Sequence, residues 1–350
     1  MAAGGADRRL ARSKRPRLLV RAVLIRAEGR SLEDDIFVVV TASGYLLGTV
    51  MKLHNLRDFV AVANSGGIRA AARQLNLSQP ALSKSISQLE DELGAPLFER
   101  TARGSTLNGY GERFLLRAEA AMQELTRGRD EITQMRGSTG GNVAFAASSV
   151  VALSFLTNAM SRFRRRFPDA MVQVHEGTYA VMLRGLRQRS LDFAVGPVPA
   201  AQISDDLTIE HLFDNARCVI GRRSHPLLHA EGLEELVGAP WLTTSAVGPQ
   251  DDEFRDIFVQ HGLVPPKSLV RCESLLALIA LLAETDALAF LPRQWAYSAV
   301  TRPVLAEIPI REKIHGPSTC LMRPSGLPLT PAAEALADAI RFSAANRDNQ

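Results

Sequence analysis

Five polar side chains within Gln79–Gln88 could bind a nucleic acid from one face of a helix. They comprise two amides, two hydroxyls and one ammonium group, at Gln79, Ser83, Lys84, Ser87 and Gln88. Residues three or four apart lie on the same side of an α-helix, so these groups would point the same way. Gln and Ser can hydrogen-bond to base edges in the major groove of DNA, and Lys can bind phosphate. The pattern therefore favours a surface that contacts double-stranded DNA.

The charges around this face fit the same partner. No Asp or Glu occurs between Phe59 and Leu89, where Arg69, Arg73 and Lys84 are the charged residues. A surface without carboxylates suits a phosphate backbone. The alternative is an ordinary three-helix bundle with a solvated polar face, and the helix pattern alone does not separate the two.

Two short helices are predicted before this face. The first has one apolar stripe and closes at Ser65-Gly66; the stripe consists of Leu53, Leu56, Phe59, Val60, Val62 and Ala63. The second is predicted over Ile68–Leu75 and ends at Asn76, because Asn tolerates the left-handed conformation of a tight turn. Its alanines at 70–72 allow another helix to cross closely.

The polar face itself belongs to a third predicted helix. Ser78 is a suitable N-cap, and Pro80 falls in the first turn, where its missing N–H costs nothing. Apolar residues at spacings of 4, 3 and 4 line the opposite side: Leu82, Ile86, Leu89 and Leu93. Packing of that side on the first helix would leave the polar side free, as in a helix-turn-helix.

A hairpin is predicted after the third helix. The segment Leu93–Gly111 contains short extended pieces about Arg103-Gly104, with Arg100 and Arg103 flanking the turn. We interpret it as a wing that lies against the backbone or minor groove of DNA.

These segments together resemble a known family. The runs "AAARQLNLSQPALSKSISQLEDELGAPLFER" (Ala70–Arg100) and "LNGYGERFL" (Leu107–Leu115) are similar to the DNA-binding domain of LysR-type transcriptional regulators. One departure is Gly67, where the family usually has a serine that caps the second helix; glycine is an acceptable cap. The resemblance implies a winged helix-turn-helix that contacts DNA through Ser78, Gln79, Pro80, Ser83, Lys84, Ser87, Arg100 and Arg103.

A long amphipathic helix is predicted after the wing. Its seam is spaced 4, 3, 4, 3, 4, 3, as in a coiled coil: Phe114, Ala118, Ala121, Leu125, Gly128, Ile132 and Met135. A helix over 109–136 would be roughly 42 Å long, which favours a dimer helix over a core helix. We expect the dimer interface at Phe114, Ala118, Ala121, Leu125 and Ile132. It matches the family's linker helix, and a dimer would present two reading helices to a two-fold DNA site.

The glycine-rich run "RGSTGGN" (Arg136–Asn142) marks the clearest domain boundary. We predict a winged helix-turn-helix domain over 51–108, a dimerisation helix over 109–137, a hinge over 138–142 and a two-lobed domain over 143–345. Residues 1–50 are expected to be a disordered or non-native extension, with the functional chain beginning at Met51.

Strand and helix patterns alternate after the hinge. The segments "VAFAASS", "AMVQVHEGT" and "LDFAVGP", separated by helices, follow the βαβαβ pattern of a parallel, doubly wound sheet. A second set begins near Asn215. Two Rossmann-like α/β lobes joined by two crossings form the effector-binding domain of the family, which is similar to periplasmic solute-binding proteins.

Hydroxyl side chains gather at the predicted carboxyl ends of the strands, where ligands bind in open α/β sheets. These ends are Ser148-Ser149, Thr178, Gly196-Pro197, Thr243-Thr244-Ser245 and Ser274. Hydroxyls beside free helix N–H groups suit a carboxylate, although each could be only a helix cap. The family resemblance implies effector contacts at Ser148, Ser149 and Thr178, supported by Thr244 and Ser245, and we add Pro197 at a strand end.

The overall charge says little about partners. The chain of 350 residues has a net charge of +4, but residues 1–50 hold nine Lys or Arg and five Asp or Glu, which already gives +4. The remaining 32 basic and 32 acidic residues, out of 41 and 37, balance. The basic composition therefore belongs to the N-terminal extension.

Other function classes have little support. Cys218, Cys272 and Cys320 are widely spaced, which favours reduced thiols in a cytosolic protein over a disulfide framework or zinc site. Pro226 separates His225 from His229, so we expect surface residues rather than metal ligands there. Nucleophile-elbow, dinucleotide and P-loop motifs are absent from the sequence, and no apolar run is long enough to span a bilayer.

The sequence thus predicts a cytoplasmic, non-enzymatic regulator without a cofactor or metal. Its expected partners are promoter DNA, a small carboxylate effector, further copies of itself as a dimer or tetramer, and RNA polymerase, with no membrane. Two alternatives are a solute-binding protein of a transporter, which would need a clean signal peptide, and an enzyme that uses the cleft, which would need an acid or base at the strand ends.

Overall fold

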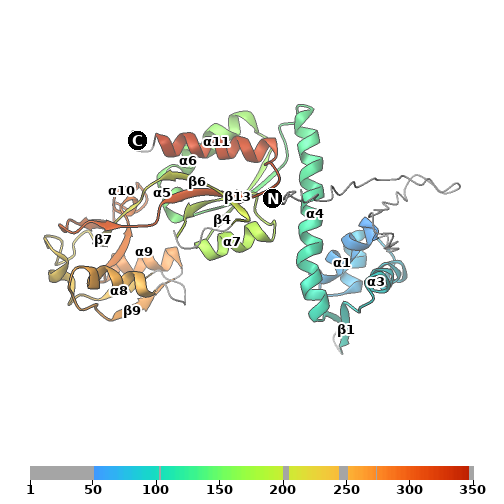
Figure 1. The fold of residues 1–350 in the computed structure, drawn as a ribbon, viewed down its shortest axis with the longest axis horizontal. Coiled ribbons are helices and arrows are strands. Elements are labelled where there is room, and N and C mark those ends of the chain that lie inside the picture. The colour runs from blue at the N-terminus through green and yellow to red at the C-terminus, as the bar shows by residue number, and fades with distance from the viewer. Residues whose placement is uncertain (1–50, 102–103, 200–204, 244–250, 273, 347–350) are drawn as a thin grey trace, which may run out of the picture. The chain divides into compact units, whose positions relative to one another are not determined.

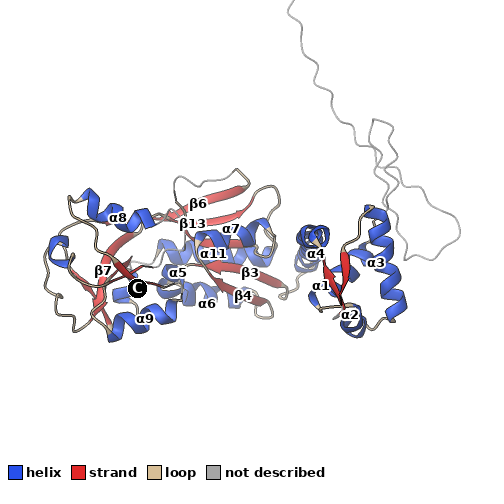
Figure 2. Cartoon of the chain, turned by 90° about the horizontal axis from the view of Figure 1, so that it is seen from below, coloured by secondary structure: helices blue, strands red, loops and turns tan. Residues whose placement is uncertain are grey.

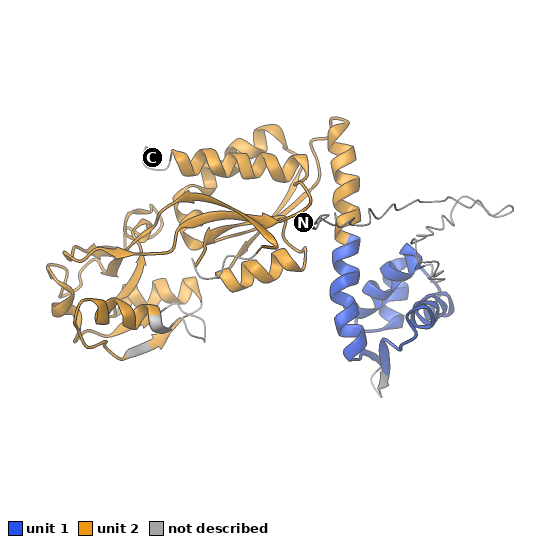
Figure 3. Cartoon of the chain, in the orientation of Figure 1, with its two compact units in different colours: residues 1–122 blue, residues 123–350 orange. Residues whose placement is uncertain are grey.

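A computed structural model of the chain describes residues 51–101, 104–199, 205–243, 251–272 and 274–346. The chain divides into two compact units, residues 1–122 and 123–350, and the division falls within the long helix α4 (Gly109–Met135) (Figure 3). The predicted extension 1–50 and three predicted site residues, Arg103, Thr244 and Ser245, lie outside the described residues.

The first unit contains the three predicted short helices, and their positions confirm the sequence interpretation. They are α1 (Leu53–Asn64), α2 (Ile68–Leu75) and α3 (Gln79–Leu93). Asn76 ends α2 in the left-handed conformation, with φ of 54°. The Ala81 N–H donates to the Ser78 hydroxyl over 3.3 Å, so Ser78 caps α3 as its side chain predicts.

One core holds these helices to the wing and to the start of α4. The wing is an antiparallel pair, β1 (Phe98–Thr101) and β2 (Gly104–Leu107). The fully buried Phe59 ring lies 5.5 Å from the ring of Phe98 and 5.3 Å from that of Phe114, measured between centroids. The wing is therefore packed against the helices at its base.

The second unit begins with a mixed five-stranded sheet in the order β4-β3-β5-β13-β6 (Figure 2). Its strands are β3 (Asn142–Ala147), β4 (Met171–Glu176), β5 (Phe193–Pro197), β6 (Leu207–Phe213) and β13 (Thr319–Pro324). β3 is parallel to β4 and to β5, as predicted, whereas β13 is antiparallel to β5 and β6. We call this sheet and its helices the first lobe.

Helices cover both faces of this sheet (Figure 1). One face packs on α5 (Ser149–Ser154), α6 (Leu156–Arg166) and α11 (Pro331–Ala345), and the other packs on α7 (Tyr179–Arg187). Side chains of a strand alternate between faces, so Phe193 and Val195 of β5 point into the first core while Ala194 points into the second.

A second lobe follows between β6 and β13. Its elements are β7 (Ala216–Arg222), the 3₁₀ helix η2 (Leu233–Leu236), β8 (Trp241–Thr243), α8 (Asp251–Gln260), β9 (Ser268–Arg271), α9 (Leu275–Glu284), β10 (Ala289–Pro292), α10 (Gln294–Tyr297), β11 (Leu305–Ile308) and β12 (Ile314–His315). β8 and β9 are parallel, but β7 is antiparallel to β10, β11 and β12.

The purely parallel, doubly wound pattern is therefore wrong for part of each lobe. The chain crosses from β6 to β7 and returns from β12 to β13, and the strands at these crossings run against their neighbours. The two crossings themselves agree with the predicted two-lobed architecture. No helix in the described ranges is long and apolar enough to traverse a lipid bilayer.

Candidate functional site

The predicted reading face lies on the outside of α3. Gln79, Lys84 and Ser87 are exposed, Ser83 is half-buried, and Ser78 and Pro80 are exposed at the start of the helix. The opposite side is packed in the core, where Leu82 and Leu89 are fully buried. The sequence pattern thus separates the two sides of the helix as predicted.

A serine on the inner side of α3 fixes which side of the helix faces the core. Ser85 is buried and its hydroxyl donates to the Asn55 side-chain oxygen over 3.0 Å. A buried hydroxyl needs such a partner, so this contact fixes the rotation of α3 against α1. The serines at 83 and 87, by contrast, remain on the outer side.

The carboxylates at either end of the acid-free stretch are turned inward. Asp58 is 3% exposed and accepts hydrogen bonds from the Arg57 guanidinium at 3.0 and 3.2 Å. Glu90 accepts from the Leu97 and Phe98 N–H groups, at 2.7 and 3.2 Å. Both carboxylates are therefore engaged in hydrogen bonds within the first unit.

The wing has the predicted hairpin form. Arg100 stands in β1 and its Cα pairs with that of Ser105 in β2, close to the turn. Asn108 caps the start of α4, where its side-chain oxygen accepts from the Tyr110 and Gly111 N–H groups at 2.9 and 3.0 Å, and its amide donates over 2.8 Å to Pro96 O, just before β1. This Asn cap, absent from the sequence interpretation, positions α4 beside the wing.

Two glycines in this unit have backbone roles. Gly67 caps α2 with φ of 144°, a conformation that L side chains rarely adopt. The departure from the family's usual serine therefore coincides with a conformation that suits glycine. Gly111 lies directly against the Leu97 carbonyl oxygen, and a Cβ there would collide with it.

The predicted dimer seam on α4 divides into two parts. Phe114 and Ala118 pack in the core of the first unit, and Ala118 is only 2% exposed. Ala121, Leu125 and Ile132 are exposed, the last two at 54% and 60%. The first two side chains are thus used within their own chain, and the heptad pattern did not distinguish these uses.

In the first lobe, the predicted effector residues gather at one edge of the sheet. β3 and β4 end together, with Ala147 paired to Glu176, and the next residues lead to Ser148 and Thr178. Pro197 ends β5 on the other side of β3. Ser149 is half-buried, Ser148 is buried and Thr178 is exposed. The parallel pairing therefore brings Ser148, Ser149, Thr178 and Pro197 to a common edge.

Two buried hydroxyls flank the end of β5 without a hydrogen-bond partner among the described residues. Ser148 is 7% exposed, and its N–H donates to Val195 O over 2.9 Å while its hydroxyl is unpaired. Thr319 is fully buried, pairs with Pro197 across β13 and β5, and has an unpaired hydroxyl as well. Thr319 was missed because it lies about 120 residues from β5 in the chain.

The second lobe has a small pocket beside β8. Its lining comprises Arg217, Leu242, Thr243, Glu253, Phe254, Ile257 and Phe290. The Thr243 hydroxyl is buried without a partner among the described residues, and Arg217 forms an ion pair with Glu253 at 3.1 Å. A cavity volume of about 20 Å³ admits little more than a water molecule.

No group of three His, Cys, Asp or Glu side chains in the described ranges is arranged to hold a metal ion. The free cysteines at 218, 272 and 320 are all buried. Burial raises the pKa of the Cys218 thiol far above its usual range, and burial also raises the pKa of Cys320. The Cys218 and Cys320 thiols would therefore be poor nucleophiles at neutral pH.

Comparisons with known proteins agree with this architecture. The model for "Bacterial regulatory helix-turn-helix protein, lysR family" matches residues 53–112, and that for "LysR substrate binding domain" matches residues 136–344. The regulator PcaQ of Agrobacterium fabrum is 32% identical over 303 residues, which cover 84% of this chain and 95% of that protein. GbpR of Rhizobium radiobacter is 29% identical over 241 residues, 68% of this chain and 80% of that protein.

A solved structure supports the fold. Full-length CbnR complexed with its target DNA has a TM-score of 0.62 and 22% identity, and the match covers 83% of this chain and 99% of that one. PcaQ and GbpR are both named as transcriptional regulators, which supports a regulatory rather than an enzymatic protein. The chain belongs to the LysR family of DNA-binding transcriptional regulators, with a helix-turn-helix domain followed by an effector-binding domain.

Proposed function

We propose that this regulator binds promoter DNA as a dimer or tetramer and responds to a small anionic metabolite held by the first lobe. The exposed polar face over Gln79–Gln88, a stretch of α3 without acids, is the observation that carries the proposal, because it offers amide, hydroxyl and ammonium groups on one side of a fixed helix. We further propose that the protein acts in the cytoplasm, where promoter DNA and RNA polymerase are found.

On DNA, α3 would enter the major groove with its first turn toward the bases. Gln79 and Ser83 would contact base edges, while Lys84 and Ser87 would hold phosphates, with Ser78 and Pro80 at the helix start. Arg100 and Arg103 of the wing would contact the backbone or minor groove. The serine–asparagine contact between Ser85 and Asn55 supports this arrangement because it fixes which side of α3 faces outward.

The effector would bind at the edge formed by Ser148, Ser149, Thr178 and Pro197, with Thr244 and Ser245 from the second lobe. A carboxylate fits because hydroxyls can donate to both of its oxygens, and the unpaired Ser148 and Thr319 hydroxyls have donors to offer. Binding would shift the lobes relative to each other, change how the chains pair, and so alter the bend of the DNA.

The dimer would form along the exposed part of the α4 seam. Ala121, Leu125 and Ile132 offer apolar surface there, and the small Gly128 lies between the last two on the same side. Two copies paired in this way would carry two α3 helices to the two halves of an inverted repeat.

Selection of genomic DNA fragments on the purified full-length protein tests the function. The proposal predicts enrichment of fragments that share an inverted repeat, followed by altered protection of that repeat when one of a panel of small aromatic or sugar carboxylates is added. Enrichment without a shared motif would contradict sequence-specific recognition. A response only to cationic or apolar compounds would contradict the anionic effector.

A further inference from the structure

The second half of α4, from Glu124 to Met135, has two functional sides. Leu125 and Ile132 are 54% and 60% exposed on one side. Arg127 follows Leu125 by two residues, and Gln134 follows Ile132 by two residues. Two residues turn an α-helix by about 200°. Arg127 and Gln134 therefore lie on the opposite side, where their hydrogen bonds hold the effector-binding domain.

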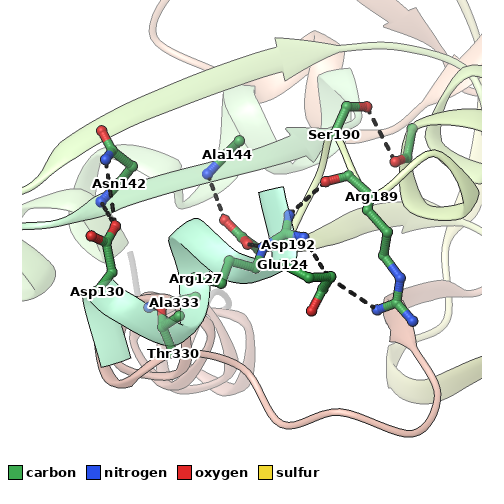
Figure 4. A network of polar contacts seen from close by, with 11 residues as sticks. Glu124, Arg127, Asp130, Asn142, Ala144, Arg189, Ser190, Asp192, Thr330 and Ala333 are labelled. Carbon is green, nitrogen blue, oxygen red and sulfur yellow. Dashed lines mark hydrogen bonds and ion pairs between the residues drawn. The ribbon is translucent and has the colours of Figure 1, made fainter. Parts of the chain in front are cut away.

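The Arg127 guanidinium donates from all three of its nitrogens, two of them to the effector-binding domain and one within α4 (Figure 4). Nε donates to the Asp192 carboxylate over 2.6 Å, Nη2 donates to Arg189 O over 2.7 Å, and Nη1 donates to Glu124 over 2.7 Å. The Asp192 side chain is 6% exposed, so this is a shielded ion pair rather than a solvated one. We call the Arg127–Asp192 pair the clamp.

Asp192 also joins two strands of the sheet. Its second carboxylate oxygen accepts from the Ala144 N–H over 2.8 Å, and its own N–H donates to Ala144 O over 2.7 Å. Ala144 lies in β3 and Asp192 immediately precedes β5. The far ends of the same two strands carry Ser148 and Pro197, and Ser148 is about 13 Å along β3 from Ala144. The clamp is thus connected to the candidate effector edge by two short strands.

Two further contacts attach the next turns of α4. Asp130 accepts from the Asn142 backbone and side-chain N–H groups at 3.3 and 3.4 Å. Gln134 is 7% exposed; its amide donates to Gly140 O over 3.1 Å and its oxygen accepts from the Ala332 N–H over 2.9 Å. Because Ala332 lies in the first turn of α11, Gln134 satisfies a helix-end N–H that otherwise lacks an intrahelical partner.

We propose that Arg127 and Asp192 are positioning residues that make the second half of α4 a rigid part of the effector-binding domain. The inference rests on the proposed function. The clamp sets the orientation of the seam of Leu125 and Ile132 relative to the effector-binding domain. That orientation in turn sets the spacing of the DNA sites that an oligomer can reach. Movement of β3 and β5 at the effector edge is then passed directly to α4. Bending would occur in α4 before Glu124 rather than at the predicted hinge 138–142.

The test uses the full-length chain and DNA fragments selected on the wild type, with the distance between the two protected sites varied in steps over one helical turn. The wild type should bind about tenfold more weakly half a turn away from its best spacing. In Arg127→Met that preference should fall to about threefold or less, with affinity for a single site unchanged. Arg127→Lys, which keeps a charge beside Asp192 but not the three-way fork, should fall between.

Arg165→Met is the matched control, since Arg165 is an exposed arginine on α6 of the same domain, away from α4. It should keep the wild-type spacing profile. A folded Arg127→Met protein with an unchanged spacing profile would overturn the clamp, and so would an Arg165→Met protein that loses the preference equally. If Arg127→Met does not fold, the Arg127→Lys profile decides the question in the same way.

Hydrogen exchange separates this inference from the proposed function, because it needs neither DNA nor effector. Amides of residues 125–135 should exchange about tenfold faster in Arg127→Met or Arg127→Lys than in the wild type, while those of α1, α2 and α3 stay unchanged. Equal exchange in the variant and the wild type would overturn the clamp. If the exchange difference between variant and wild type is present but the wild type binds no DNA, only the proposed function is overturned.

Discussion

The Glu90 carboxylate accepts a hydrogen bond from the Leu97 N–H over 2.7 Å, which turns the first acid after the reading face toward the base of the wing. Its second contact, with the Phe98 N–H, lies at the start of β1. One carboxylate therefore ties α3 to the wing and is turned away from the polar face over Gln79–Gln88. The first turns of α3 can therefore approach a phosphate backbone although the last turn of the helix carries acids.

Lys84→Ala should weaken DNA binding about tenfold at low salt, because one phosphate contact per protomer is lost. The slope of log affinity against log salt should decrease by about 0.9 for each protomer bound. Fluorescence anisotropy with a selected fragment measures both quantities. Lys313→Ala is the control, since Lys313 is an exposed lysine of the effector-binding domain. Equal losses in the two variants would contradict a specific role for α3.

Ser149→Ala should leave DNA binding intact and reduce the response to an identified effector about tenfold, as expected for the loss of one hydrogen bond to a charged ligand. Ser154→Ala in the same helix is the control, because the Ser154 hydroxyl donates to Val150 O over 2.6 Å within the protein. An unchanged effector response in Ser149→Ala would remove Ser149 from the site.

Thr319→Val should stabilise the effector-binding domain by about 1 kcal/mol, because it removes a buried hydroxyl without a partner among the described residues. It should also weaken effector binding. Thr330→Val should have the opposite effect on stability, since the Thr330 hydroxyl caps α11 by accepting from the Ala333 N–H. Thermal unfolding compares the two, and a loss of stability in Thr319→Val would show that its hydroxyl has a partner.

Gly111→Ala should destabilise the DNA-binding domain by about 1–3 kcal/mol, because the new methyl group would overlap the Leu97 carbonyl oxygen. Gly109→Ala, two residues earlier in the same helix, meets no atom within 4 Å and should change stability little. Thermal unfolding followed by circular dichroism measures both variants. A tolerated Gly111→Ala would mean that α4 does not approach the wing as closely as described.

Cys218 and Cys320 should react slowly with iodoacetamide at pH 8 in the folded protein. Their raised pKa values keep both thiols protonated at that pH, and only the thiolate reacts. Peptide mapping by mass spectrometry over time should show modification of these two residues about 100-fold slower than in urea, since burial also blocks access. Rapid labelling of the native protein at Cys218 would contradict its packing in the second lobe.

Much of the DNA-binding domain could be predicted from sequence because its signals are local. Ser78 caps the helix that it precedes, Asn76 ends the helix before it, and apolar residues three or four apart share one side. The same reasoning fails where one pattern has two uses. Phe114 and Ala118 continue the heptad of Leu125 and Ile132, yet they pack in their own chain.

The effector-binding domain was less predictable because its sheet is assembled from distant segments. β13 inserts between β5 and β6 after the chain has built the whole second lobe, and only this pairing brings Thr319 beside Pro197. Likewise, Arg127 and Asp192 are 65 residues apart, so nothing in their local sequence marks them as partners. β6 was not among the predicted strands, although its alternating apolar and polar residues are typical of a half-buried strand.

Footprinting of the purified protein on the DNA upstream of its own gene, at two salt concentrations, tests the central claim most directly. The account predicts protection of an inverted repeat that weakens steeply as salt rises, because the proposed contacts of Lys84 and the wing arginines with phosphates would release counterions. Lys84→Ala should weaken that protection. Binding that ignores sequence, or protection that is unaffected by Lys84→Ala and by salt, would contradict recognition through the exposed face of α3.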